Sequence, residues 1–233
     1  MVRKLVFEEY LDLAKYIYER QEKYLDDGSE GTVYKGTDGF AYKLMYEEPW
    51  ISDIKILNPD EIITIDDINL KSFAFPIELY LIDGKVMGSK MKYVRPSIVS
   101  NDYTLSPVDF YNIDIYQFYK AYEILLEDVK KLSDMNILMF DVANNLMYDG
   151  KTITIVDTHY YTREDYNTYE KNLHIVEQAV KAIFDLWLDS AGLEEVEIEN
   201  HNMIKYLEDV FDKMSELNKD EKFFFEQILR KKF

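Results

Sequence analysis

The chain has 233 residues, with 45 Asp and Glu against 27 Lys and Arg, no cysteine, 20 tyrosines and 13 phenylalanines. A hydrophobic content of 47% and an aromatic content of 15% exclude a disordered or collagen-like chain and predict one compact fold or two closely packed lobes. The net charge of −18 repels phosphate groups, which disfavours nucleic acids and anionic membrane surfaces as partners.

Missing residue types and missing patterns exclude further kinds of site and of cellular location. The absence of cysteine excludes disulfides, thiolate metal sites and cysteine nucleophiles. The N-terminal segment carries Glu8 and Glu9 where a signal peptide needs apolar residues, and no uncharged apolar run of about 18 residues occurs. The three histidines, at 159, 174 and 201, lack the spacing of metal ligands. We therefore expect a cytoplasmic protein with no membrane partner and no zinc site.

The predicted elements change character along the chain. Residues 7–23 carry apolar side chains at helical spacing, which predicts a leading helix and an N-terminal helical extension over residues 1–23. Residues 24–94 alternate in short segments and predict a β-rich lobe. The expected strands lie around residues 24–25, 32–35, 40–45, 77–82 and 86–94. Asp-Gly pairs at 38–39 and 83–84 predict hairpin turns, and hence an antiparallel sheet.

One helix is expected inside this lobe. The segment Asn58-Pro59-Asp60-Glu61 has the pattern of a helix start, with Asn58 as the N-cap and Glu61 closing a capping box.

Residues 95–233 predict a mainly helical lobe that follows a joint near Arg95-Pro96. A helix opened by Ser106-Pro107 is expected to run to about residue 132. A hairpin through Asp149-Gly150 interrupts the helices. The remaining expected elements are strands at 146–148 and 152–156 and helices at 163–190, 202–217 and 219–231.

Three segments carry candidate chemistry. In Gly28-Ser29-Glu30-Gly31, glycines would let backbone N–H groups approach phosphate, and a plain hairpin turn is the alternative. Lys43 lies in an apolar strand, where a lysine is usually paired, and an edge-strand lysine reaching solvent is the alternative. Asp141, Asn145 and Asp157 offer the oxygen ligands that Mg²⁺ prefers, and turn capping is the alternative.

Together and in this order, these segments resemble the protein-kinase-like superfamily over about residues 24 to 190. The matching segments are Gly28-x-x-Gly31-x-Val33, Ala41-x-Lys43, Met91-Lys92-Tyr93-Val94, Met139-Phe140-Asp141 with Asn145-Leu146-Met147, and Asp157-Thr158-His159. The resemblance implies an α+β, two-lobed protein-kinase-like fold, in which an antiparallel β-sheet N-lobe with one helix precedes a mainly helical C-lobe.

The resemblance also implies a role for each matching residue. Lys43 would orient the α- and β-phosphates of ATP, and Asp141 would accept the proton of the substrate hydroxyl. Asn145 and Asp157 would hold Mg²⁺. The other implied nucleotide-binding positions, in the phosphate loop and the hinge, are Gly28, Ser29, Gly31, Val33, Met91, Lys92 and Val94. Glu61 is the candidate acidic partner of Lys43, and Glu47 and Glu48 are the alternatives.

Departures from the family pattern keep several functions open. Asp26 replaces the usual first glycine, the loop from Asp141 to Asn145 is one residue short, and Thr158-His159 replaces Phe-Gly. The first hypothesis is a small atypical Mg-ATP-dependent phosphotransferase of bacterial type, similar to the aminoglycoside and choline phosphotransferases, whose acceptor is an unidentified small molecule or protein. The second is a pseudokinase that senses nucleotide or acts as a scaffold, and nucleotidyl transfer is a third.

The oligomeric state is a separate prediction. We expect a monomer. A dimer is the alternative, because Phe223, Phe224 and Phe225 cannot all lie on one helix face.

Overall fold

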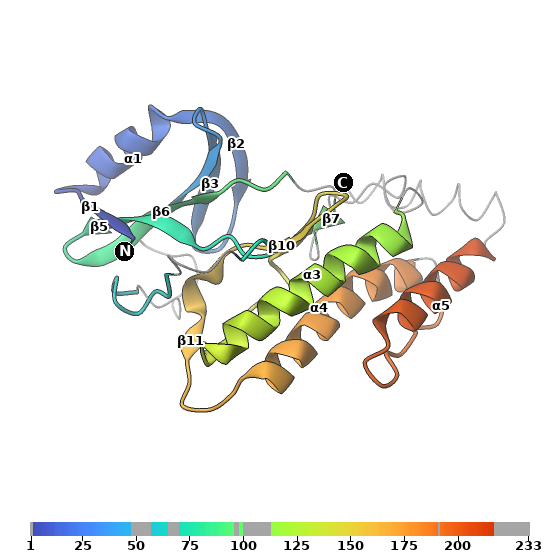
Figure 1. Ribbon diagram of the computed structural model, residues 1–233. Coiled ribbons are helices and arrows are strands. Elements are labelled where there is room, and N and C mark those ends of the chain that lie inside the picture. Colours follow the sequence, from blue (N-terminus) through green and yellow to red (C-terminus); the bar gives the residue numbers. More distant parts are fainter. Residues whose placement is uncertain are drawn as a thin grey trace. The chain divides into compact units, whose positions relative to one another are not determined.

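The computed structural model describes residues 2–47, 57–64, 70–95, 98–99, 113–190 and 192–216, and Figure 1 labels most of their helices and strands. The chain forms two compact units. The first consists of Met1–Asn69, Ala74–Val94 and Asp157–Thr162, and the second of Leu70–Phe73, Arg95–Val156 and Arg163–Phe233. The helices and the mixed sheet confirm the predicted α+β class.

A six-stranded sheet in the order β1-β5-β6-β4-β3-β2 forms the first unit. Its strands are β1 (Arg3–Val6), β2 (Gln21–Asp27), β3 (Gly31–Gly36), β4 (Phe40–Met45), β5 (Pro76–Ile82) and β6 (Lys85–Lys92). The β3–β4 and β5–β6 pairs are antiparallel, and their turns place Gly39 and Gly84 at φ of 81° and 76°, as the Asp-Gly pairs predict. The prediction of a purely antiparallel sheet is wrong, because β1 pairs in parallel with β5.

The N-terminal residues are part of this unit and not a separate helical extension. Helix α1 (Tyr10–Tyr18) is shorter than the predicted helix over 7–23, since Glu9 is extended and β2 begins at Gln21. Its buried residues Leu13 and Ile17 pack in one core cluster with residues of the sheet, and this cluster explains the apolar spacing that predicted the helix. The sheet residues of that cluster are Tyr34, Tyr42, Leu44, Tyr80 and Met87.

The predicted helix start at Asn58 is a turn within the described residues 57–64. One half of the predicted capping arrangement is present, because the Asn58 backbone N–H donates to Glu61 Oε2 at 2.8 Å. The Glu61 N–H donates to the backbone carbonyl of Asn58 at 3.0 Å, which closes a turn. The β-branched Ile62 that follows is buried against Leu79 and Val86 of the sheet. Packing of this side chain therefore outweighs the local helix signal.

The helices that the structure describes in the second unit are three, and they lie side by side (Figure 1). They are α3 (Ile115–Asp134), α4 (Tyr169–Ser190) and α5 (Met203–Ser215). Helix α3 begins at Ile115 because the Asp114 side chain accepts hydrogen bonds from the N–H groups of Tyr116 and Gln117. Among the helices that the structure describes, none is both long and apolar enough to cross a membrane.

Some predicted features lie outside the described residues. These are the helix start at Ser106-Pro107, the C-terminal helix over 219–231 and the run Phe223-Phe224-Phe225.

A short hairpin lies between the candidate residues Asn145 and Asp157 in sequence. The strands β9 (Leu146–Tyr148) and β10 (Ile153–Ile155) pair antiparallel, as predicted, and β7 (Ile98–Val99) extends them. Two further short strands, β8 (Ile137–Leu138) and β11 (Thr162–Arg163), were not predicted, and they pair with each other. Asn145 directly precedes β9, and Asp157 follows β10 by two residues at the start of the 3₁₀ turn η1 (Thr158–Tyr160).

A buried carboxylate joins helix α3 to the segment Leu70–Phe73. Asp128 is 1% exposed and accepts hydrogen bonds from the backbone N–H groups of Lys71 and Ser72 at 2.6 and 2.9 Å, and from Lys131 Nζ at 2.7 Å. Ser72 in turn accepts from the N–H of Ile155. These bonds link the hairpin to the helical core.

Candidate functional site

Lys43 is a buried, paired lysine in the middle of the sheet. Its side chain is 6% exposed, and its Nζ lies 2.8 Å from Glu30 Oε2 and 2.7 Å from Asp157 Oδ2. Burial alone would lower the pKa of Lys43, but the charges of Asp157 and Glu30 outweigh burial and raise the pKa above its ordinary value. Lys43 is therefore a charged group held inside the first unit and not an edge-strand lysine that reaches solvent.

Asp157 has an unusual backbone conformation and a carboxylate with one protein partner on each oxygen. Its φ of 54° and ψ of 53° place it in the left-handed region, which few residues other than glycine, asparagine and aspartate adopt. Oδ2 contacts Lys43, and Oδ1 lies 2.7 Å from His159 Nδ1. Burial opposes ionisation, but the Lys43 charge and the contact with His159 outweigh it and hold the pKa of Asp157 well below its usual range. Asp157 is thus a carboxylate at neutral pH.

This depressed pKa predicts how stability depends on pH. A carboxyl whose folded pKa lies below its unfolded value of 3.8 stabilises the fold above that value and loses its contribution as the pH falls below it. The advantage of the wild type over Asp157→Asn in free energy of unfolding should therefore shrink by about 1 kcal/mol between pH 7 and pH 3. Urea unfolding at these two pH values measures it, and a constant difference would contradict the depressed pKa.

In the turn between β2 and β3, packing against β4 explains why Gly31 must be glycine. A Cβ on Gly31 would lie 2.2 Å from the Leu44 carbonyl oxygen, so only glycine allows this close approach to β4. The Gly28 N–H donates to the Gly31 carbonyl at 2.9 Å, and Ser29 lies between them in the turn. Val33 follows on β3, directly opposite Lys43. Phosphate binding by this turn stays a prediction.

The acidic partners of Lys43 are Glu30 and Asp157, and the prediction of Glu61 is wrong. The Glu61 carboxylate accepts hydrogen bonds from the backbone and side chain of Asn58. Burial, and after it the neighbouring Glu30 carboxylate, raises the pKa of Tyr160 above its ordinary value. The sequence signal for Glu30 was its position in the glycine turn directly before β3. Because β3 pairs antiparallel with β4, this turn lies near Lys43 on β4.

The structure also locates one of the two alternative partners of Lys43 and the predicted hinge residues. Of the alternative partners of Lys43, Glu47 is exposed and Glu48 lies outside the described residues. The predicted hinge residues Met91 and Lys92 end β6, where Met91 is buried opposite Ala41, and Val94 follows the strand. Adenine binding by this segment stays a prediction.

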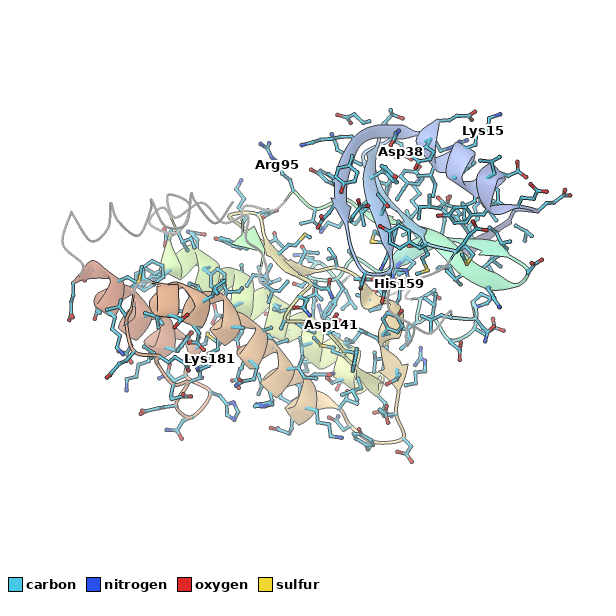
Figure 2. All side chains as sticks on the ribbon, turned by 180° about the vertical axis from the view of Figure 1, so that it is seen from behind. Lys15, Asp38, Arg95, Asp141, His159 and Lys181 are labelled. Carbon is cyan, nitrogen blue, oxygen red and sulfur yellow. The ribbon has the colours of Figure 1, made fainter. Side chains whose placement is uncertain are left out.

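In the second unit, Asp141 is the centre of a tight polar loop (Figure 2). It is exposed, with a left-handed φ of 49°. Its Oδ1 accepts from Asn144 Nδ2 at 2.6 Å, and its carbonyl accepts from Asn145 Nδ2 at 2.7 Å. The buried Val142 and Leu146 anchor the loop on both sides. Strained residues of this kind concentrate at functional sites, where surrounding contacts maintain them.

A buried asparagine of α4 holds the start of this loop, and the sequence analysis missed it. Asn172 has no exposed surface, its Oδ1 accepts from the Met139 N–H at 2.9 Å, and its Nδ2 donates to the Ile137 carbonyl at 2.8 Å and to Ser133 Oγ at 2.9 Å. The available signal was an asparagine four residues before Val176 on the apolar face of a predicted helix. A polar residue there must find buried partners.

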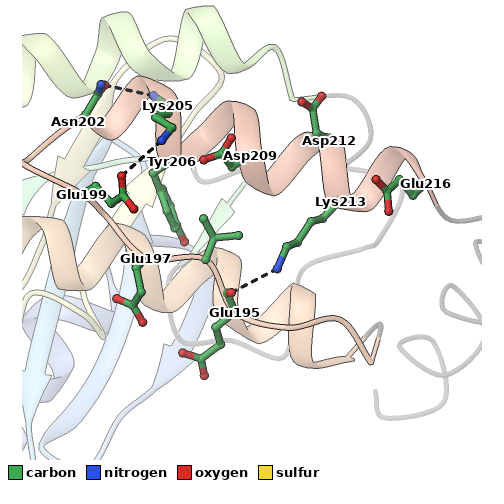
Figure 3. A pocket seen from close by; sticks show the side chains of 11 residues that line it. Glu195, Glu197, Glu199, Asn202, Lys205, Tyr206, Asp209, Asp212, Lys213 and Glu216 are labelled. Carbon is green, nitrogen blue, oxygen red and sulfur yellow. Dashed lines mark hydrogen bonds and ion pairs between the residues drawn. The ribbon is translucent and has the colours of Figure 1, made fainter.

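A cavity of about 390 Å³ lies elsewhere in the second unit, along α5 and the residues before it (Figure 3). Six carboxylates and two lysines line it, and both lysines are bonded: Lys205 to Glu199, and Lys213 to the carbonyl of Glu195. No predicted site residue lines this cavity. In the part of the chain that the structure describes, no group of three or more His, Asp or Glu is arranged to hold a metal ion.

Comparison with protein-family models gives no match, and comparison with curated proteins finds no similar sequence. The roles of the candidate residues therefore rest on the contacts described above.

Proposed function

We propose that the chain is an ATP-dependent phosphotransferase with a two-lobed, protein-kinase-like fold, which transfers a phosphoryl group to a hydroxyl of a small molecule or protein. The observation that carries the proposal is the partly buried ion pair between Lys43 and Asp157, which lie 114 residues apart in sequence. The resemblance requires a strand lysine and an acidic metal ligand at these positions, and no short-range pattern explains their contact.

The residues present fit the chemistry of a nucleotide with a divalent cation. Asp157 is ionised and 27% exposed, and Asn145 carries an amide oxygen, so both offer the hard ligands that Mg²⁺ prefers. When bound, Mg²⁺ would neutralise charge on the phosphates. The Lys43 ammonium would contact the phosphates, which would compete with the Glu30 carboxylate for it.

Asp141 would act as the acceptor of the hydroxyl proton. Its carboxylate is exposed, and the contacts with Asn144 and Asn145 orient it. A positioned base of this kind contributes to phosphoryl transfer mainly by orienting the nucleophile.

A second candidate function is a pseudokinase that senses nucleotide or acts as a scaffold without turnover. The contacts of Lys43 favour it, because Glu30 places a carboxylate where a phosphate would bind. Both oxygens of Asp157 are also engaged by protein groups.

Thermal unfolding with and without Mg-ATP tests the proposal. Nucleotide at about 100 times its dissociation constant should stabilise the wild type by about 2.7 kcal/mol, or roughly 5 to 10 °C. Lys43→Met should lose this shift, whereas Lys85→Met, at an exposed lysine of β6, should keep it. No shift at millimolar Mg-ATP would overturn nucleotide binding, and a shift without any ATP turnover would favour the second candidate.

A further inference from the structure

We infer that Ser89 and His159 are positioning residues for Asp157: they fix one oxygen of its carboxylate so that the other is presented to Lys43. Ser89 Oγ lies 3.1 Å from His159 Nε2, and His159 Nδ1 lies 2.7 Å from Asp157 Oδ1. All four residues belong to the first unit. The role of Ser89 and His159 in catalysis rests on the proposed function. Their contacts with each other and with Asp157 are seen directly in the structure.

The register of the sheet places Lys43 and Ser89 side by side. Lys43 on β4 and Ser89 on β6 are directly opposite each other in an antiparallel pair. Residues in such positions project their side chains from the same face of the sheet. Lys43 reaches Asp157 Oδ2 directly, and Ser89 reaches Oδ1 through the imidazole of His159. Two neighbouring strands therefore hold both oxygens of one carboxylate.

Hydrogen-bond chemistry defines the direction of the contact between His159 and Asp157. Asp157 is ion-paired with Lys43 through Oδ2, and a carboxylate in an ion pair only accepts hydrogen bonds. At 2.7 Å from Oδ1, the Nδ1 of His159 must therefore carry the proton and donate it. The Ser89 hydroxyl can donate or accept, and it therefore serves as the partner of Nε2 whichever protons the ring carries. Partners that orient a ligand in this way typically change metal affinity by 10- to 100-fold when removed.

Burial makes this arrangement rigid. Ser89 has no exposed surface, and His159, which Figure 2 labels, is 1% exposed, so water does not compete for their hydrogen bonds. The 3₁₀ turn that begins after Asp157 receives no side-chain capping bond from it. The carboxylate is thus oriented by Lys43 and His159 and not by its own turn.

The first experiment needs no ligand. Nitrogen and proton NMR of the imidazole groups reports which ring nitrogen is protonated, and variants of the exposed residues His174 and His201 to Gln assign the remaining signal to His159. We expect a protected proton on Nδ1 of His159 in the wild type. In Ser89→Ala we expect this proton to exchange with water at least about tenfold faster. A ring without a proton on Nδ1 would overturn the inference.

The second experiment measures the Mg²⁺ dependence of the stabilisation by ATP. Ser89→Ala should raise the Mg²⁺ concentration needed for half of the thermal shift about tenfold, with little change in the shift produced by metal-free ATP, because Lys43 is intact. Ser89→Thr, which keeps the hydroxyl, should restore the wild-type requirement. An unchanged Mg²⁺ requirement in a folded Ser89→Ala protein would overturn the positioning role.

The two experiments separate this inference from the proposed function. If the wild type gives no shift with Mg-ATP, the proposed function fails, and the NMR result alone decides the inference. Faster exchange in Ser89→Ala would then support the orientation of Asp157 by Ser89 and His159, and unchanged exchange would overturn it.

Discussion

Under the proposed phosphotransferase function, replacing Asp141 by Asn is expected to reduce phosphoryl transfer by about 10²- to 10⁴-fold, while Mg-ATP still stabilises the protein. The amide cannot accept the proton of the attacking hydroxyl, but it can keep the hydrogen bond with Asn144, since an amide oxygen also accepts. The loop geometry should therefore survive while the base is lost. Hydrolysis of ATP measures the effect without knowledge of the acceptor, because water takes the place of the acceptor hydroxyl.

Asp134→Asn is the matched control for this experiment. Asp134 is an exposed aspartate at the end of α3, and the same change there should leave the rate within experimental error. Equal rates for Asp141→Asn and the wild type would remove Asp141 from the mechanism. A loss of both hydrolysis and the thermal shift would instead indicate that the substitution disturbs nucleotide binding.

Replacing Asn172 by Leu is expected to lower the free energy of unfolding by about 2 to 4 kcal/mol. Leucine has a similar size but leaves the Met139 N–H without the Asn172 acceptor, and it removes the donor to the Ile137 carbonyl and to Ser133. A buried polar group that loses its partner costs about 1 to 3 kcal/mol. Urea unfolding of the wild type and the variant measures the difference.

Gln178→Leu provides the control for Asn172→Leu. Gln178 is an exposed amide on the same helix, and its replacement by leucine should change stability by no more than about 0.5 kcal/mol. If Asn172→Leu were equally mild, the network around Met139 would not be a determinant of the fold, and the loop that carries Asp141 would be held by other contacts.

Local patterns predicted most of the fold. Alternating residues and Asp-Gly turns predicted the four strands β3 to β6, because hairpins pair segments that are close in sequence. The strand β1 was missed because its partner is β5, with Arg3 opposite Glu78, and parallel pairing of distant segments leaves no local signal. The pattern at Asn58 correctly predicted that Glu61 accepts a hydrogen bond from the Asn58 N–H. The predicted helix is a turn, because Ile62 is buried in a core cluster with residues of the sheet.

The same difference separates the residues of the candidate site. The resemblance selected Lys43, Asp141 and Asp157, because it depends on residues at fixed spacing in ordered motifs, and the structure brings Lys43 and Asp157 into contact. It did not predict Asn172 or Ser89, which are single buried polar residues within apolar segments. Their partners lie 33 and 70 residues away in sequence, so only the folded chain identifies them.

The two ion pairs of Lys43 differ in when they can form during synthesis. Glu30 precedes Lys43 by 13 residues, whereas Asp157 follows it by 114. At a translation rate of about 5 to 20 residues per second, the ribosome needs roughly 6 to 23 s to reach Asp157 after Lys43. Lys43 can therefore pair with Glu30 as soon as the hairpin of β3 and β4 forms in the nascent chain. The ion pair with Asp157 forms later, after residues 157–162 have been synthesised and have packed into the first unit.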